Sequence, residues 1–147
     1  MINGKSFTGM TPQTSEQNGI GVIYQEFNLV GDLSVAENIF LGRAIRKGMV
    51  IDLKAMERES KKILDSLNIK INPKTLVKTL SVGYQQMVEI AKAVSQNAKL
   101  LIMDEPSAPL TSAEVEAMFA IVDKLKAGGV SIIYISHRLD EIFSFGR

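Results

Sequence analysis

The 147-residue sequence contains no cysteine and no tryptophan, and its single histidine is His137. Without cysteine the chain can form neither disulfides nor thiolate metal sites, which is typical of proteins from a reducing compartment. The longest uninterrupted apolar runs, Leu100–Met103 and Ile132–Ile135, are far too short to cross a bilayer. The first ten residues also lack the apolar segment of a secretion signal. These absences favour a cytoplasmic globular protein.

An excess of charge of either sign is missing as well. The 17 basic and 16 acidic residues leave a formal net charge of +1, and 46% of the residues are apolar. Such a balance lacks the basic footprint of a dedicated nucleic-acid-binding protein, and the apolar content argues against intrinsic disorder. A chain of this length and composition is expected to form one domain with a sizeable core.

Three short apolar stretches predict strands at Ile20–Tyr24, Leu100–Met103 and Val130–Ile135. Because apolar residues in them are continuous rather than alternating, we expect a parallel sheet with both faces covered by helices. Helical patterns lie between the strands, and two of them open with capping boxes, Ser34–Glu37 and Thr111–Glu114. This order predicts the α/β class with right-handed crossovers.

The middle of the chain is expected to be helical. Asp52 can cap one helix, the segment Ser81–Ala98 carries a second apolar stripe, and Gly128-Gly129 supplies a stop for the helix that begins after Thr111. No strand is expected from about residue 34 to residue 80. We therefore predict a helical insertion between two strands of one sheet.

Two carboxylates follow the second predicted strand directly, at Asp104 and Glu105. Ligands of open parallel sheets bind beyond the carboxyl ends of the strands. Successive strand side chains point in opposite directions, so Asp104 could hold Mg²⁺ while Glu105 orients a water, a division that suits nucleotide hydrolysis. Taken alone, the pair is better explained as a solvated strand end.

Four other residues could contribute to the same chemistry. Ser81 and Gly83 stand at the start of a helix, where free backbone N–H groups can bind an anion. Gln25 follows a strand and could reach a metal or a water, and His137 follows another strand and could contact a terminal phosphate. Each feature alone is common in proteins without such a function, but their order along the chain is not.

The ordered set of Gln25, Leu80–Gln85, Asp104, Glu105 and His137 resembles the ATP-binding-cassette (ABC) ATPase family. In that resemblance they match the Q-loop glutamine, the signature loop, the Walker B aspartate, the catalytic glutamate and the switch histidine. It implies a partial P-loop NTPase core with parallel strands and an inserted helical subdomain. The core would comprise residues 1–33 and 99–147, and the subdomain, which includes the signature loop, residues 34–98.

A narrower resemblance links the chain to the ATP-binding subunits of bacterial monosaccharide importers of the ribose, galactose and xylose type. It is carried by Tyr24–Val30, Leu33–Arg43 and Tyr134–Arg138. In that family two cassettes are fused in one polypeptide, and this sequence is more similar to the first.

The resemblance implies ATP and Mg²⁺ as cofactors and ATP hydrolysis as the reaction. Asp104 would hold the metal together with Gln25. Glu105 would polarise the attacking water, His137 would contact the γ-phosphate, and Gln25 would sense both metal and phosphate.

The implied partners are a second cassette and the membrane permease. Ser81 and Gly83 would bind the ATP held by the second cassette, and the subdomain of residues 34–98 would touch the permease. No nucleic acid and no direct sugar binding are expected. The resemblance places the protein in the cytoplasm, peripherally on the inner face of the plasma membrane.

The family's phosphate-binding loop, G-x-x-x-x-G-K-[ST], is not recognisable. Gly4-Lys5-Ser6 matches its end, but only three residues precede it and Lys5 lies only twenty residues before Gln25. We therefore expect Ile2–Lys5 to form a hairpin strand and turn beyond the true loop. The chain ends just after a helical pattern at Leu139–Phe145. The expectation is a cassette fragment without Walker A, inactive toward ATP by itself and prone to associate through exposed strand edges.

Three positions depart from the family pattern. Val82 and Tyr84 replace the usual Gly and Gln of the signature loop, and Thr111 replaces a usual Asp. Val82 would weaken the contact with the second cassette if that position required a positive φ.

Two other functions stay open at this stage. One is a catalytically dead interaction fragment, and the other is a non-transport ABC ATPase of DNA repair or translation. The latter would insert coiled coils or basic segments, and the interval from Gln25 to Ser81 contains neither heptads nor a basic run.

Overall fold

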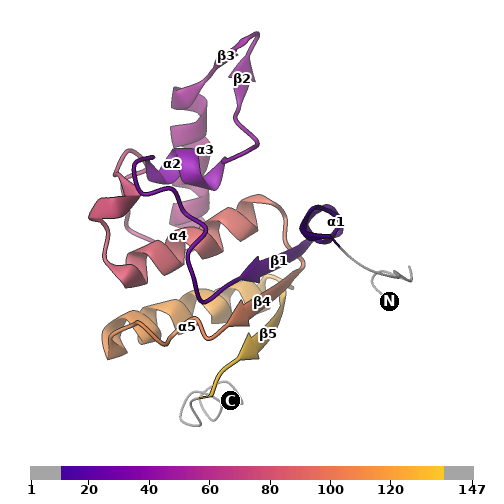
Figure 1. The fold of residues 1–147 in the computed structure, drawn as a ribbon, viewed down its shortest axis with the longest axis vertical. Coiled ribbons are helices and arrows are strands. Elements are labelled where there is room, and N and C mark those ends of the chain that lie inside the picture. Colours follow the sequence, from indigo (N-terminus) through magenta and orange to yellow (C-terminus); the bar gives the residue numbers. More distant parts are fainter. Residues whose placement is uncertain (1–10, 138–147) are drawn as a thin grey trace.

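The computed structural model describes residues 11–137 of the chain. Its centre is a parallel sheet in the order β1 (Ile20–Ile23), β4 (Leu100–Asp104) and β5 (Ser131–Ile135). Helices α4 (Val82–Ser95) and α5 (Ser112–Ala127) pack against this sheet (Figure 1). The α/β class predicted from the sequence is confirmed, and the carboxyl ends of all three strands meet at one edge.

Burial of the sheet differs between its two faces. On β4, Leu101 and Met103 are fully buried, whereas on β5 the side chains of Ile133 and Ile135 are 46% and 44% exposed. The expectation that every strand is covered on both faces is therefore wrong for β5. The covered face packs on α4 and α5, and within residues 11–137 no element covers Ile133 and Ile135 to the same extent.

The helices begin where their capping residues predict. Ser34 caps α2 (Val35–Ile39) and Thr111 caps α5, each in a complete capping box with the glutamate three residues later. Gly129, with φ of +88°, ends α5 in the left-handed region. These confirmed boundaries depend on hydrogen bonds within a single turn.

Two features of the fold have no counterpart in the sequence prediction. One is α1 (Pro12–Gln17), capped by Thr11. The other is a hairpin of β2 (Arg46–Lys47) and β3 (Val50–Ile51), which corrects the expectation that residues 34–80 contain no strand. Strands of two exposed residues have no hydrophobic pattern, and only Gly48, with φ of +65°, marks the turn between them.

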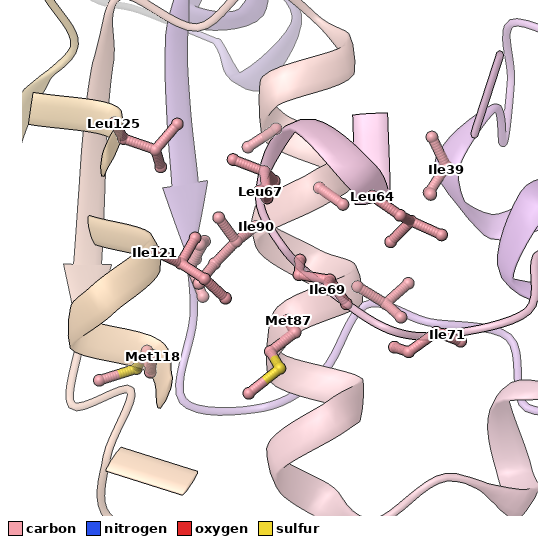
Figure 2. Close-up of a cluster of buried hydrophobic side chains, with 14 of the residues drawn as sticks. Ile39, Leu64, Leu67, Ile69, Ile71, Met87, Ile90, Met118, Ile121 and Leu125 are labelled. Atoms are coloured by element: carbon pink, nitrogen blue, oxygen red, sulfur yellow. The ribbon is translucent and has the colours of Figure 1, made fainter. Parts of the chain in front are cut away.

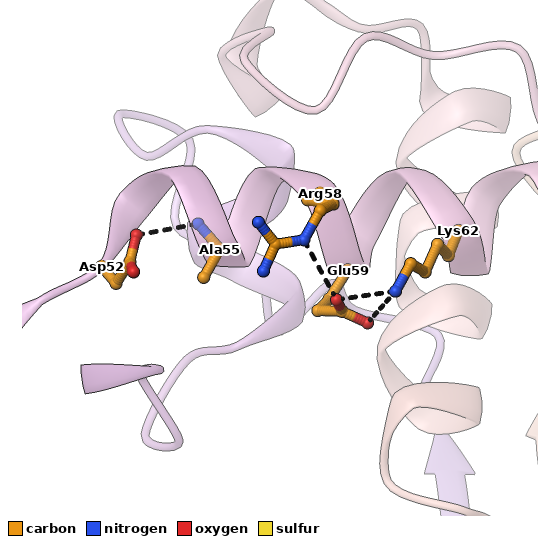
Figure 3. A network of polar contacts seen from close by, with 5 residues as sticks. All are labelled: Asp52, Ala55, Arg58, Glu59 and Lys62. Atoms are coloured by element: carbon orange, nitrogen blue, oxygen red, sulfur yellow. Dashed lines mark hydrogen bonds and ion pairs between the residues drawn. The ribbon is translucent and has the colours of Figure 1, made fainter. Parts of the chain in front are cut away.

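Helix α3 (Leu53–Ser66) has one charged face and one buried face. The Asp52 carboxylate accepts the backbone N–H of Ala55 at 2.9 Å, as predicted for its cap, and Glu59 pairs with Arg58 at 3.5 Å and with Lys62 at 2.9 Å (Figure 3). Exposed ion pairs contribute little stability, so the buried face holds the helix in place. That face carries Ala55, Met56, Ser60 and Leu64.

A single hydrophobic cluster connects the helical region to the sheet. Helix α4 lies at its centre, because it contacts α2 and α3 as well as β1 and α5. The short 3₁₀ helix η1 (Val77–Thr79) also contributes Val77. Figure 2 shows the side chains that join these elements, among them Ile39, Leu64, Leu67, Ile69, Ile71, Met87, Ile90, Met118, Ile121 and Leu125.

The predicted hairpin at Ile2–Lys5 and the helical pattern at Leu139–Phe145 lie outside the described residues. Within residues 11–137, no helix combines the length and the apolarity needed to cross a bilayer.

Candidate functional site

The candidate site lies at the edge of the sheet where the three strands end. Asp104 is the last residue of β4 and pairs in register with Ile135, the last residue of β5. The backbone N–H of Glu105 donates to the carbonyl oxygen of Ile135 at 2.8 Å. Gln25 and His137 each stand two residues beyond the end of their strand. The topology therefore brings all four predicted residues to one edge.

Glu105 and His137 are in direct contact. The distance between His137 Nε2 and Glu105 Oε1 is 2.9 Å, with side chains that are 88% and 24% exposed for His137 and Glu105 respectively. Glu105 has φ of +45°, so it turns out of the strand and does not continue the alternation expected of successive strand residues. Such a backbone is uncommon for a residue other than glycine and is characteristic of functional sites.

Asp104 and Gln25 suit a magnesium ion that is shared with a phosphate ligand. Mg²⁺ is bound through one or two carboxylates plus phosphate oxygens and waters. Asp104 is half-buried and Gln25 is exposed, so both can offer a hard oxygen at the edge. In the described part of the chain no three His, Cys, Asp or Glu side chains gather into a metal cluster. The donor set therefore fits a cation that arrives with its ligand better than a closed protein site.

Ser81 and Gly83 belong to a different element, the amino end of α4. The Ser81 hydroxyl caps the helix by accepting the N–H of Tyr84 at 3.4 Å, as predicted, and donates to Glu114 Oε1 at 2.8 Å. A Cβ at Gly83 would lie 2.4 Å from Glu114 Cδ. The predicted anion site at this helix end is therefore covered by a carboxylate from α5.

The signature-loop departure at Val82 carries no backbone strain. Val82 is the first residue of α4, and it is not among the residues with positive φ. The loss of a trans contact through φ at this position, considered from the sequence, therefore has no basis in the structure.

Glu114 joins the starts of two helices, a role that sequence reasoning missed. Its Oε2 accepts the N–H and the hydroxyl of Thr111 at 3.0 Å and 2.9 Å, while its Oε1 accepts from Ser81. The N–H of Thr111 first, then the Ser81 hydroxyl, hold the pKa of Glu114 below its ordinary value. The capping box was visible in the sequence, but the contact across 33 residues was not.

Replacing Glu114 with Gln is expected to destabilise the fold at neutral pH, because the amide removes a negative charge from two helix amino ends. A carboxyl whose folded pKa is lowered stabilises the protein above its unfolded pKa, and this contribution is lost as pH falls through the folded pKa. The stability gap between the variant and wild type should therefore shrink as pH falls below about 4, and it should close once Glu114 is protonated in the folded state. Urea unfolding of both proteins at neutral pH and at a pH below about 4 measures this stability gap.

The matched control is Glu116→Gln, which changes an exposed glutamate two residues along α5. It should leave stability unchanged at both pH values. A Glu114→Gln gap of the same size at acidic and neutral pH would contradict the electrostatic explanation.

Glu89 is a second acid that sequence reasoning missed, because it lies within the apolar pattern of α4. Its side chain is buried, with 8% of the residue exposed, and its Oε1 accepts the backbone N–H of Asn28 at 2.7 Å. Burial raises the pKa of this carboxyl. A cavity of about 500 Å³ lies beside it, lined among others by Tyr24, Asn28, Glu89 and Lys92.

The fold is that of an ATP-binding cassette. A solved nucleotide-free ATP-binding cassette from an ABC transporter matches with a TM-score of 0.80 and 26% sequence identity, over 96% of this chain and 60% of that chain. Residues 1–108 match the family model described as ABC transporter, so the chain belongs to this family.

Among curated proteins, ribose import ATP-binding protein RbsA 1 of Streptomyces avermitilis is 50% identical over 146 residues, which is 99% of this chain. Galactose/methyl galactoside import ATP-binding protein MglA of Escherichia coli K12 is 48% identical over 143 residues, which is 97% of this chain. The chain spans 28% of the length of each. Both the family resemblance and the narrower similarity to sugar-import subunits are thus confirmed, while the roles of the individual site residues remain predictions.

Proposed function

We propose that this chain is part of the ATP-hydrolysing subunit of a bacterial importer for a monosaccharide such as ribose or galactose. Two observations support the proposal. The first is the similarity to ribose and galactose import subunits over almost the whole chain. The second, which carries the chemistry, is the contact between Glu105 and His137 at the edge where Asp104 and Gln25 also end.

Glu105 would activate the attacking water. Its carboxylate stands just beyond the strand and is partly shielded, so it can accept a hydrogen bond from a water aimed at the γ-phosphate and take its proton. His137 Nε2, 2.9 Å from Glu105 Oε1, fixes the direction of that carboxylate. The exposed imidazole is also free to turn toward a phosphate oxygen. In this reaction class positioning and charge neutralisation do most of the catalysis.

Asp104, at the end of β4, and Gln25, just after β1, would complete the site. Asp104 would hold Mg²⁺, which neutralises phosphate charge when bound, and the Gln25 amide oxygen would face the same ion and the water. Gln25 stands at the start of the segment that leads from β1 into the helical region. Its contact with the bound nucleotide would therefore be transmitted to the helical region.

Ser81 and Gly83 would act on a different nucleotide, the one held by a second cassette. Their position at the amino end of α4, and not on the three strands that carry the other four residues, supports this division. A phosphate that binds there would displace the Glu114 carboxylate from Ser81. The subdomain of residues 34–98 would contact the membrane permease from the cytoplasmic side. Sugar recognition would belong to other components of the importer.

The test is reconstitution of the full-length protein with its permease and sugar-binding protein in liposomes. We expect ATP hydrolysis that rises when the binding protein carries ribose, galactose or a similar sugar, together with uptake of that sugar. Hydrolysis stimulated by DNA or ribosomes would instead favour the repair or translation alternative. Absence of hydrolysis in the full-length protein would favour the alternative that this chain is a catalytically dead interaction fragment.

A further inference from the structure

We propose that Glu89 is a positioning residue that fastens the segment carrying Gln25 to helix α4. Through this attachment, a displacement of α4 would move Gln25 relative to the sheet edge. The catalytic consequence rests on the function proposed above, whereas the attachment itself does not.

The attachment is a pair of contacts between α4 and the backbone of Asn28. Glu89 Oε1 accepts the Asn28 N–H at 2.7 Å, and Lys92 Nζ donates to the Asn28 carbonyl oxygen at 3.5 Å. Both polar groups of one loop residue are thus held by side chains one helical turn apart on α4. Asn28 lies more than sixty positions from its partners, so the contacts are tertiary.

A second attachment follows two residues later. Asn38 on α2 is fully buried, its Oδ1 accepts the N–H of Val30 at 2.7 Å, and its Nδ2 donates to the carbonyl oxygen of Val30 at 3.0 Å. Helix α2 itself packs against α4. Residues 28–30 are therefore bound to the helical region, while Ile20–Ile23 belong to the sheet.

Gln25 lies between the sheet and the part of the chain that is bound to the helical region. Residues 24–27 connect the end of β1 to Asn28, the first position of this segment that is held by α4, so a shift of α4 against β1 would be transmitted to them. Tyr24, Gln25 and Glu26 are exposed, and the cavity of about 500 Å³ lies beside Tyr24 and Asn28. The exposed segment therefore has open space beside it.

The chemistry of Glu89 fits a tether better than it fits packing. Burial raises the pKa of its carboxyl, so the ionised form is destabilised where it stands, and an apolar side chain would fill the position without that penalty. What the carboxylate provides is a strong acceptor for a backbone N–H. Ser81 caps the same helix about two turns earlier, so a ligand that engages Ser81 would act on Asn28 through a rigid element.

The experiment compares Glu89→Met and Glu89→Gln in the full-length protein. Met has a similar length but no strong acceptor, whereas the Gln side-chain carbonyl can still accept the Asn28 N–H. We expect hydrogen exchange at the Asn28 amide to be about tenfold faster in the Met variant and nearly unchanged in the Gln variant. The Val30 amide, held by Asn38, serves as the internal reference, and Glu116→Met as the surface control.

The second measurement is steady-state ATP hydrolysis. We expect Glu89→Met to lower kcat about tenfold with little change in KM for ATP, and Glu89→Gln to restore most of it. Unchanged Asn28 exchange in the Met variant would overturn the attachment. Faster exchange with wild-type kcat, or a kcat loss shared equally by the Gln variant, would overturn the catalytic role. If wild type does not hydrolyse ATP, the proposed function fails, and the Asn28 exchange still decides the attachment.

Discussion

Replacing Glu105 with Gln in the full-length protein should lower the rate of ATP hydrolysis by about 100-fold or more while leaving ATP binding intact. The amide keeps the size of the carboxylate and can still contact His137, but it cannot accept a proton from water. Because hydrolysis would normally separate the two cassettes of the full-length protein, the variant should also accumulate in the closed state, with ATP held between them.

Single-turnover hydrolysis measures the first effect, and the amount of unhydrolysed ATP retained by the protein after rapid gel filtration measures the second. Glu116→Gln is the control, since it changes an exposed glutamate on helix α5 that is none of the predicted site residues. ATP turnover at the wild-type rate in Glu105→Gln would remove Glu105 from the mechanism and leave its contact with His137 as a structural feature.

Asn38→Leu should lower the free energy of unfolding by about 3 kcal/mol. The fully buried amide accepts the N–H of Val30 and donates to the carbonyl oxygens of Val30, Leu33 and Ser34. Leucine has a similar volume but leaves the Val30 N–H without its acceptor, and it removes one of the two donors at each carbonyl oxygen. An unsatisfied buried polar group alone costs about 1–3 kcal/mol. Urea unfolding monitored by circular dichroism measures the loss.

Two variants make the Asn38 result specific. Asn38→Asp keeps the acceptor for Val30 but removes the donors, so its stability should also fall. Gln17→Leu, an amide replacement at an exposed position of α1, should leave stability within about 0.5 kcal/mol of wild type. A loss below about 1 kcal/mol for Asn38→Leu would show that water replaces the amide.

The parts of the fold that the sequence predicted correctly are governed by local chemistry. The capping boxes at Ser34 and Thr111 and the stop at Gly129 each lie within one turn of a helix, and the structure confirms them. The strands were visible because their apolar runs are continuous. The sequence wrongly predicted that both faces of every strand are covered. Ile133 and Ile135 are exposed, and their exposure depends on what packs against β5.

The order of the site residues along the chain predicted that they meet at one edge of the sheet, but it did not predict their side-chain contacts. Parallel strands bring Asp104, Gln25 and His137 to one edge, and motif order was enough to indicate this. The left-handed backbone of Glu105, and the bonds that Glu89 and Glu114 make across more than thirty residues, depend on the tertiary fold. An acid within an apolar stripe, as at Glu89, is the one sequence signal that could have been followed.

The most direct test of the central claim is a crystal structure of the full-length protein with Mg²⁺ and a non-hydrolysable ATP analogue. The account predicts the γ-phosphate at the carboxyl edge of the sheet, with His137 and Gln25 in hydrogen-bonding reach, Asp104 on the metal side and Glu105 facing the attacking water. A nucleotide bound elsewhere, with these four side chains turned away from it, would contradict the account.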